Sequence, residues 1–292
     1  MSNTNTLLPA YMIGAAMLCM TSCTLDDPYG DTGGEMPAQE SRISSIKSLG
    51  MHMIYTDYDV QGHLTRIELR EAITHNLTWT DGKLTRIETI EWTQQYDHST
   101  EKEINVPAYR DIFTNITVDD RGYITGFDSE EFKYSYTYNP DSQQNENTVT
   151  GHTFSSSSMS YDADGHLCRS VNDGETVSLT WTDGLLMQSV DLSDGETHIY
   201  EYSDAVNTHL QWDPMLPAAG GLLNITGLFG TAPARFVKKV TITDDRGYTD
   251  TQQYSYRLQD NGLIHTCRFL SNDNEEILPL TYYYEPGIQS VR

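Results

Sequence analysis

The sequence VDDRGY at residues 118–123 recurs almost unchanged as TDDRGY at residues 243–248. Two related stretches are YDVQGHLTRI at residues 58–67 and YDADGHLCRS at residues 161–170. Each contains an acidic or amide turn that ends in glycine and leads into a run of alternating polar and apolar residues. This pattern is typical of two antiparallel strands that are joined by a tight turn.

The turn glycines recur at a regular spacing along the chain. Successive intervals between them are 20, 40, 43, 19, 63 and 15 residues, so all but the last lie near multiples of twenty. Twenty residues accommodate two strands of about eight residues and two tight turns, which is one hairpin of a meander. The aligned positions are Gly62, Gly82, Gly122, Gly165, Gly184, Gly247 and Gly262.

The runs between the turns have a period of two. In FKYSYTYN, Phe132, Tyr134, Tyr136 and Tyr138 share one face of the predicted strand, and polar residues occupy the other. The pattern predicts an all-β fold, an antiparallel up-and-down meander that forms a large barrel or a strongly curled sheet. The aromatic strip is either the core of that barrel or an exposed platform for sugar rings, and we favour the core.

The composition limits the choice of partners. The chain of 292 residues has 18 Lys and Arg against 42 Asp and Glu, a formal net charge of −24. Such a surface repels nucleic acids and anionic lipid headgroups, so nucleic acid is not expected as a partner. The excess acid favours solubility, with Ca²⁺ binding as the alternative.

The first forty residues are predicted to direct the protein to its location. Residues 1–22 hold a short apolar run and are expected to be a signal peptide, because Met20-Thr21-Ser22-Cys23 resembles a bacterial lipobox. Cys23 would then be acylated and held in the lipid of the outer membrane. Residues 23–40 are acidic, rich in Gly and Pro, and predicted to be a flexible tether. The alternative is a buried N-terminal strand or helix.

The whole plan resembles a known group of proteins. The YDxxGHL stretches look like YD repeats of the Rhs type, and the lipobox, tether and hairpins together resemble a Bacteroidetes lipoprotein family of unknown function with a porin-like fold. The resemblance implies a large antiparallel barrel or strongly curled sheet in residues 41–292. It assigns no functional residue. The acidic residues just past Cys23 resemble the surface-export signal of Bacteroidetes lipoproteins, with a plain charged linker as the alternative.

Two stretches depart from the strand pattern. An insertion at about residues 205–234 is apolar, rich in Gly and Pro, and without a period of two. It is expected to complete the core, or to cap one end of the barrel as a site-forming element. Residues 138–151 are polar and are expected to be a surface loop.

The sequence contains no recognisable catalytic motif. It lacks HExxH, GxSxG, a Walker loop and a CxxC pair. No cofactor is expected, although Asp162 and Asp164 leave a Ca²⁺ site open; turn chemistry explains these aspartates without an ion. Cys168 and Cys267 either form a disulfide or stay as free thiols.

These observations favour a lipid-anchored protein of the envelope or cell surface with a non-enzymatic binding or scaffold role, its partner being a glycan or an envelope protein. Trp79, Trp181 and Trp212 are the candidate ligand-binding residues, and no residue is predicted to bind a metal. The alternative is a carboxylate-dependent glycan hydrolase in the mouth of the barrel.

Overall fold

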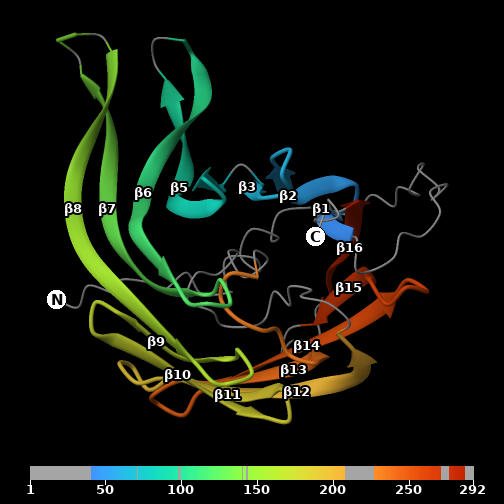
Figure 1. The fold of residues 1–292 in the computed structure, drawn as a ribbon. Helices are drawn as coiled ribbons and strands as arrows, with labels where there is room; N and C mark the ends of the chain where they lie inside the picture. The colour runs from blue at the N-terminus through green and yellow to red at the C-terminus, as the bar shows by residue number, and fades with distance from the viewer. Residues whose placement is uncertain are drawn as a thin grey trace.

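The protein is a closed antiparallel β-barrel. The computed structural model describes residues 41–70, 72–97, 100–139, 141–142, 144–207, 227–270 and 276–286. Within these ranges each strand pairs with the next along the chain, and β1 pairs with β16 to close the ring (Figure 1). The predicted all-β meander is confirmed, and the sheet closes as a barrel. Cys23 and Trp212 lie outside the described residues.

The strands follow one another without crossover connections. Their bounds are β1 Ser41–Ser48, β2 Met51–Tyr58, β3 Leu64–Leu69, β4 Ile73–Thr80, β5 Lys83–Asp97, β6 Lys102–Val118, β7 Ile124–Asn139, β8 Gln144–Tyr161, β9 Leu167–Asn172, β10 Glu175–Thr182, β11 Leu185–Asp191, β12 Thr197–Val206, β13 Arg235–Thr243, β14 Thr249–Leu258, β15 Ile264–Leu270 and β16 Glu276–Pro286.

Two hairpins are about twice as tall as the others. β5 to β8 have 15 to 18 residues each, so the hairpins β5–β6 and β7–β8 rise past the neighbouring strands (Figure 1). The intervals of 40 and 43 residues between turn glycines are therefore single tall hairpins. The expectation of a surface loop at residues 138–151 is wrong, because β7 runs to Asn139 and β8 starts at Gln144. Both faces meet solvent there, so the sequence shows no alternation.

The buried apolar side chains face the inside of the barrel. Ile46, Ile67, Ile87, Phe236 and Ile264 are at most 1% exposed and belong to one core cluster that spans the barrel. Burial of these side chains stabilises the fold by roughly 25 cal/mol for each Å² of apolar surface that is removed from water. The interior is therefore a packed core in the region that these side chains line.

The outer face of the sheet carries charges that are paired with one another. Arg42 contacts Glu285 at 2.8 Å across the β1–β16 seam, and Lys239 contacts Glu201 at 2.9 Å across β12–β13. Arg86 and Arg110 both contact Glu88. A transmembrane barrel has the reverse arrangement, with an apolar band outside and a polar interior. This outer face is suited to water.

The described residues include no apolar helix of membrane-spanning length.

The repeated sequence, VDDRGY at residues 118–123 and TDDRGY at residues 243–248, is a turn used at both ends of the barrel. Asp119 Oδ1 accepts hydrogen bonds from the backbone N–H groups of Arg121 and Tyr123, and Asp244 Oδ1 does the same for Arg246 and Tyr248. In a meander the turns after even-numbered strands lie at one end, here called rim A, and those after odd-numbered strands at the other, rim B. The two copies follow β6 and β13, so they lie on opposite rims and cannot share a site.

Six aromatic side chains link neighbouring strands near rim A. Each lies on an even-numbered strand and donates a hydrogen bond of 2.6–3.0 Å to a backbone carbonyl on the preceding strand. A buried phenol or indole needs such a partner for its polar tip. The pairs are Tyr58 with Ile43, Trp79 with Leu64, Tyr161 with Ile124, Trp181 with Leu167, Tyr202 with Leu186, and Tyr284 with Ile264.

Residues 227–234, the described end of the predicted insertion, form a strap across rim A. Backbone hydrogen bonds hold the strap against three rim A turns, and they join Leu228 to Ile124, Thr231 to Gly165, and Ala234 to Gly184. Phe229 is 7% exposed and joins the core cluster. The strap therefore contributes to the core and also covers part of this rim.

Cys168 and Cys267 are free thiols, so the disulfide alternative is wrong.

The strap predicts a contrast between two turn glycines. Gly122 and Gly165 have nearly equal φ values, +88° and +89°, but a Cβ on Gly165 would lie 2.8 Å from both Thr231 Oγ1 and the Tyr123 ring. Gly122→Ala should lower the free energy of unfolding by roughly 1–2 kcal/mol through backbone strain alone. Gly165→Ala should lower it further, because the strap must shift. Urea unfolding measures the free energy of unfolding of both variants. Equal losses would show that the contact between the Gly165 turn and the strap does not contribute to stability.

Candidate functional site

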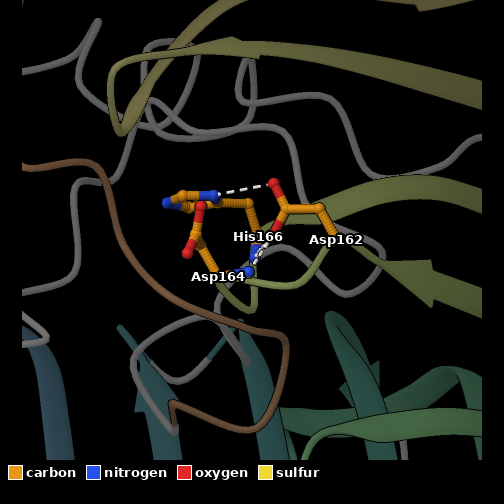
Figure 2. Close-up of side chains that lie close together, drawn as sticks. All are labelled: Asp162, Asp164 and His166. Carbon is orange, nitrogen blue, oxygen red and sulfur yellow. Dashed lines mark hydrogen bonds and ion pairs between the residues drawn. The ribbon is translucent and has the colours of Figure 1, made fainter.

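The described residues bring three metal-ligating side chains together in the turn after β8. Figure 2 shows Asp162, Asp164 and His166, whose ligand atoms lie within 4.8 Å of one another. Asp162 Oδ1 accepts the backbone N–H groups of Asp164 and His166, both at 2.9 Å, while Oδ2 lies 2.9 Å from His166 Nδ1. Burial raises the pKa of Asp162, but these hydrogen bonds outweigh that effect and lower the pKa overall.

The same geometry occurs without the second carboxylate. In the turn after β2, Asp59 Oδ1 accepts the N–H groups of Gln61 and His63, and Oδ2 lies 3.0 Å from His63 Nδ1. Gln61 stands where the other turn has Asp164. Since the arrangement forms with either residue, the conformation of the turn accounts for this cluster.

The histidines of these turns also position the two tryptophans that the sequence singled out. His63 stacks on Trp79 with ring centroids 4.5 Å apart, and His166 stacks on Trp181 at 4.3 Å. Both indoles also pack against the core. Their structural role is therefore evident, and ligand binding by Trp79, Trp181 and Trp212 stays a prediction.

The tall β7–β8 hairpin presents an aromatic ladder on its outer face. Phe132 stacks on His152 with centroids 4.4 Å apart and planes at 13°, and His152 lies 4.4 Å from Phe154. Phe154 is 66% exposed. Phe127 packs against the core, and the pairing of β7 with β8 is regular from Phe127 to Phe132. Successive side chains of a strand point to opposite faces, so a residue five positions further on lies on the opposite face. Phe132 therefore faces outward, so the expectation that its strip forms the core is wrong here.

A hollow of about 620 Å³ adjoins the exposed end of this ladder. It forms because the β9–β10 turn ends beside the middle of the taller β8, where Asp173 N–H reaches the carbonyl of Ser156. The lining residues are Thr114, Asn115, Asp128, Ser129, Glu130, Phe154, Ser155, Ser156, Asp173 and Gly174. The hollow thus places an exposed ring beside hydroxyl, amide and carboxylate groups.

Asp128 is the most strongly fixed polar group of the hollow. Its two oxygens accept hydrogen bonds of 2.8 Å from Asn115 Nδ2 and Ser156 Oγ. These hydrogen bonds, with that of Asn115 the larger, lower the pKa of Asp128. Glu130 lies 3.5 Å from His152 Nε2 and connects the hollow to the ladder. Asp128 is therefore ionised at neutral pH and can accept hydrogen bonds from a ligand.

A second polar group lies on the inner face of the tall strands. Thr89, Asp111 and Glu131 are direct cross-strand neighbours on β5, β6 and β7. Burial, followed by the charges of Glu131 and Glu91, raises the pKa of Asp111 to about 7. One buried oxygen of Asp111 has no hydrogen-bond partner among the described residues. This carboxyl group can hold a proton near neutral pH, as a general acid does.

The sequence pattern does not mark Asp111, Asp128, Glu130, His152 or Phe154 as site residues. They lie on β6, β7 and β8 but come together only through the register of these strands. The one available signal was the alternation of His152 and Phe154 with Thr153 and Ser155. That pattern predicts a strand with an aromatic face, and it does not say which partner the face meets.

Comparison with known proteins supplies structural neighbours only. No family model and no curated protein matches the chain. Two solved structures of porin-like proteins, from Bacteroides uniformis and Bacteroides vulgatus, match with TM-scores of 0.40 each and identities of 12% and 11%. They cover 83% and 84% of this chain and 98% and 99% of theirs. Such likenesses carry no argument about activity.

A further match is to the Tc holotoxin pore of Photorhabdus luminescens, at 13% identity, with a TM-score of 0.18. It covers 80% of this chain but 9% of that one. The likeness to YD repeats and the lipoprotein signal stay predictions.

The buried Asp111 predicts a stability that depends on pH. Because its pKa is about 7 in the folded state against 3.8 normally, the folded state keeps its proton between pH 4 and 7 while the unfolded state loses it. Stability should therefore fall as the pH rises through this window. Asp111→Asn should leave stability unchanged at pH 4 and raise the free energy of unfolding by roughly 2–4 kcal/mol at pH 8.

Chemical denaturation across this pH range measures the effect, with Asp120→Asn at an exposed turn position as the matched control. If Asp111→Asn and Asp120→Asn gave the same profile, the raised pKa would be refuted.

The turn cluster predicts unequal effects of its two aspartates. Asp162→Ala removes two hydrogen bonds to backbone N–H groups and one to His166, so the free energy of unfolding should fall by roughly 1–3 kcal/mol. Asp164→Ala removes an exposed carboxylate and should change it by less than about 0.5 kcal/mol. Thermal unfolding compares the two; a metal-supported turn would instead lose similar stability with either change, and only while the metal was present.

Proposed function

We propose that this protein is a non-enzymatic glycan-binding protein of the bacterial envelope, anchored to the outer membrane through acylated Cys23 and displayed at the cell surface. The observation that supports glycan binding is the hollow on the outer face of β6–β8, where Phe154 is 66% exposed beside Asp128, Glu130 and Ser156. Sugars present C–H faces and hydroxyl groups together. An exposed ring beside hydrogen-bonding groups complements both.

The position of the hollow suits a binding role. It lies on the outer face of a tall hairpin, and the described lining residues come from three strands, β6, β7 and β8, and from the β9–β10 turn, so the sheet fixes their spacing. The ring of His152, which is tilted by 52° against Phe154, contacts it with ring centroids 4.4 Å apart. Little reorganisation is needed before a ligand binds, which limits the entropy lost on binding.

Substitution of the exposed ring tests the proposal. Phe154→Ala should weaken binding to the glycan found by array screening at least tenfold, because a stacking surface is removed while the strand stays paired. Tyr248, which is 81% exposed on the β13–β14 turn, provides the matched control, and Tyr248→Ala should bind as the wild type does. Isothermal titration calorimetry measures both. Equal affinities for the two variants would contradict a site at the hollow.

A carboxylate-dependent glycan hydrolase is the second candidate, favoured by the inner-face group. Asp111, whose pKa is raised to about 7, would donate its proton to a glycosidic oxygen, and the carboxyl group of Glu131 or Glu91 would take a proton from the attacking water. The array ligands, incubated with the protein, distinguish the two functions. Release of reducing ends that is lost in Asp111→Asn would support the hydrolase, and intact ligand would support binding alone.

A further inference from the structure

The polar lining of the hollow has one sign of charge. Asp128, Glu130 and Asp173 contribute carboxylates, and the lining residues include no Lys or Arg. Asn115 and Ser156 donate their hydrogen bonds to Asp128, which stabilises its ionised form. A neutral glycan would leave these charges uncompensated when it covers them, and desolvating an uncompensated charge is unfavourable.

Like the carboxylates, the exposed ring of Phe154 favours a cationic ligand. The face of an aromatic ring is negative, so it attracts a cation within about 6 Å of the ring centroid. Phe154 lines the hollow together with the carboxylates and is 66% exposed, so its ring is accessible to a ligand. A protonated amine in the hollow would meet both the carboxylates and the ring. Because the chain carries a net charge of −24, its field also attracts cationic ligands to the surface.

We propose that the hollow selects glycans with a free, protonated amino group over their neutral N-acetylated counterparts. This inference rests on the proposed function and specifies the class of glycan. The hydroxyl and amide groups at Ser156, Asn115 and Thr114 bind the sugar in common, and the carboxylates with Phe154 bind the ammonium group. Acetylation removes the charge and adds bulk at that position, so the N-acetylated form loses both contributions.

A matched pair of ligands tests the inference on the full-length protein. The probes are a tetramer of β-1,4-linked N-acetylglucosamine and its fully de-N-acetylated form, titrated by calorimetry at pH 6. The amino form should bind at least tenfold tighter, and this advantage should shrink as NaCl rises from 50 to 300 mM, because salt screens the carboxylates.

Three variants locate the effect. Glu130→Gln should reduce the preference for the amino form several-fold, and Phe154→Ala should weaken both forms. Asp183→Asn removes one exposed charge from the β10–β11 turn and should leave both affinities unchanged.

Three results would overturn the inference. Equal binding of both forms, lost in Phe154→Ala, would leave glycan binding in place but refute selection of the amine. Tight binding of the amino form that none of the variants changes would show non-specific attraction to the acidic surface. If neither form bound while other glycans on the array also failed, the proposed function itself would be refuted.

Discussion

The pairing of β1 with β16 is the constraint on which the rest of the structure depends. Residues 41–47 meet residues 281–286 in an antiparallel register, with one irregularity between Ile43 and Ser45. Closure removes both sheet edges and gives the strands a common interior. Ile46 and Tyr282, which face each other across this seam, are 0% and 3% exposed. Once the ring is closed, each strand has one inner and one outer face, and the hollow and the Asp111 group belong to opposite faces.

The division into an inner and an outer face separates the buried carboxyl group of Asp111 from the solvent-exposed hollow. The inner face carries the apolar core and, in the tall strands, Asp111 with its raised pKa. The outer face carries ion pairs, the aromatic ladder and the hollow. The tall hairpins carry both the Asp111 group and the hollow, because β5 to β8 extend beyond the neighbouring shorter strands.

Turns were the part of the fold that sequence predicted well. All seven aligned glycines have positive φ, between 72° and 91°, because the chain reverses at each of them. The strand length between Gly82 and Gly122 was less predictable, since 40 residues fit one tall hairpin or two short ones equally well. Residues 138–151 were misread because polar residues on both faces of a projecting hairpin look like a loop.

The site was harder to predict than the fold. The alternation of aromatic and polar residues in FKYSYTYN does not show which of the two faces points into the barrel. That direction follows from Phe127, whose ring packs inside and so places Phe132 outside. Both residues are phenylalanine, so composition gives no preference. The hollow depends on a difference in length between β8 and β9, which is a property of neighbouring strands and not of either sequence alone.

The charged outer face of this barrel is suited to water, so a ligand site can lie on it. Spin labels at Thr180 and Ser255, two exposed outer-face positions, test this in the full-length protein on native membranes, with Cys168 replaced by Ser. We expect high accessibility of both labels to a water-soluble nickel relaxation agent and low accessibility to membrane-dissolved oxygen. The reverse order at both positions would place the outer face in lipid and rule out a water-facing site there.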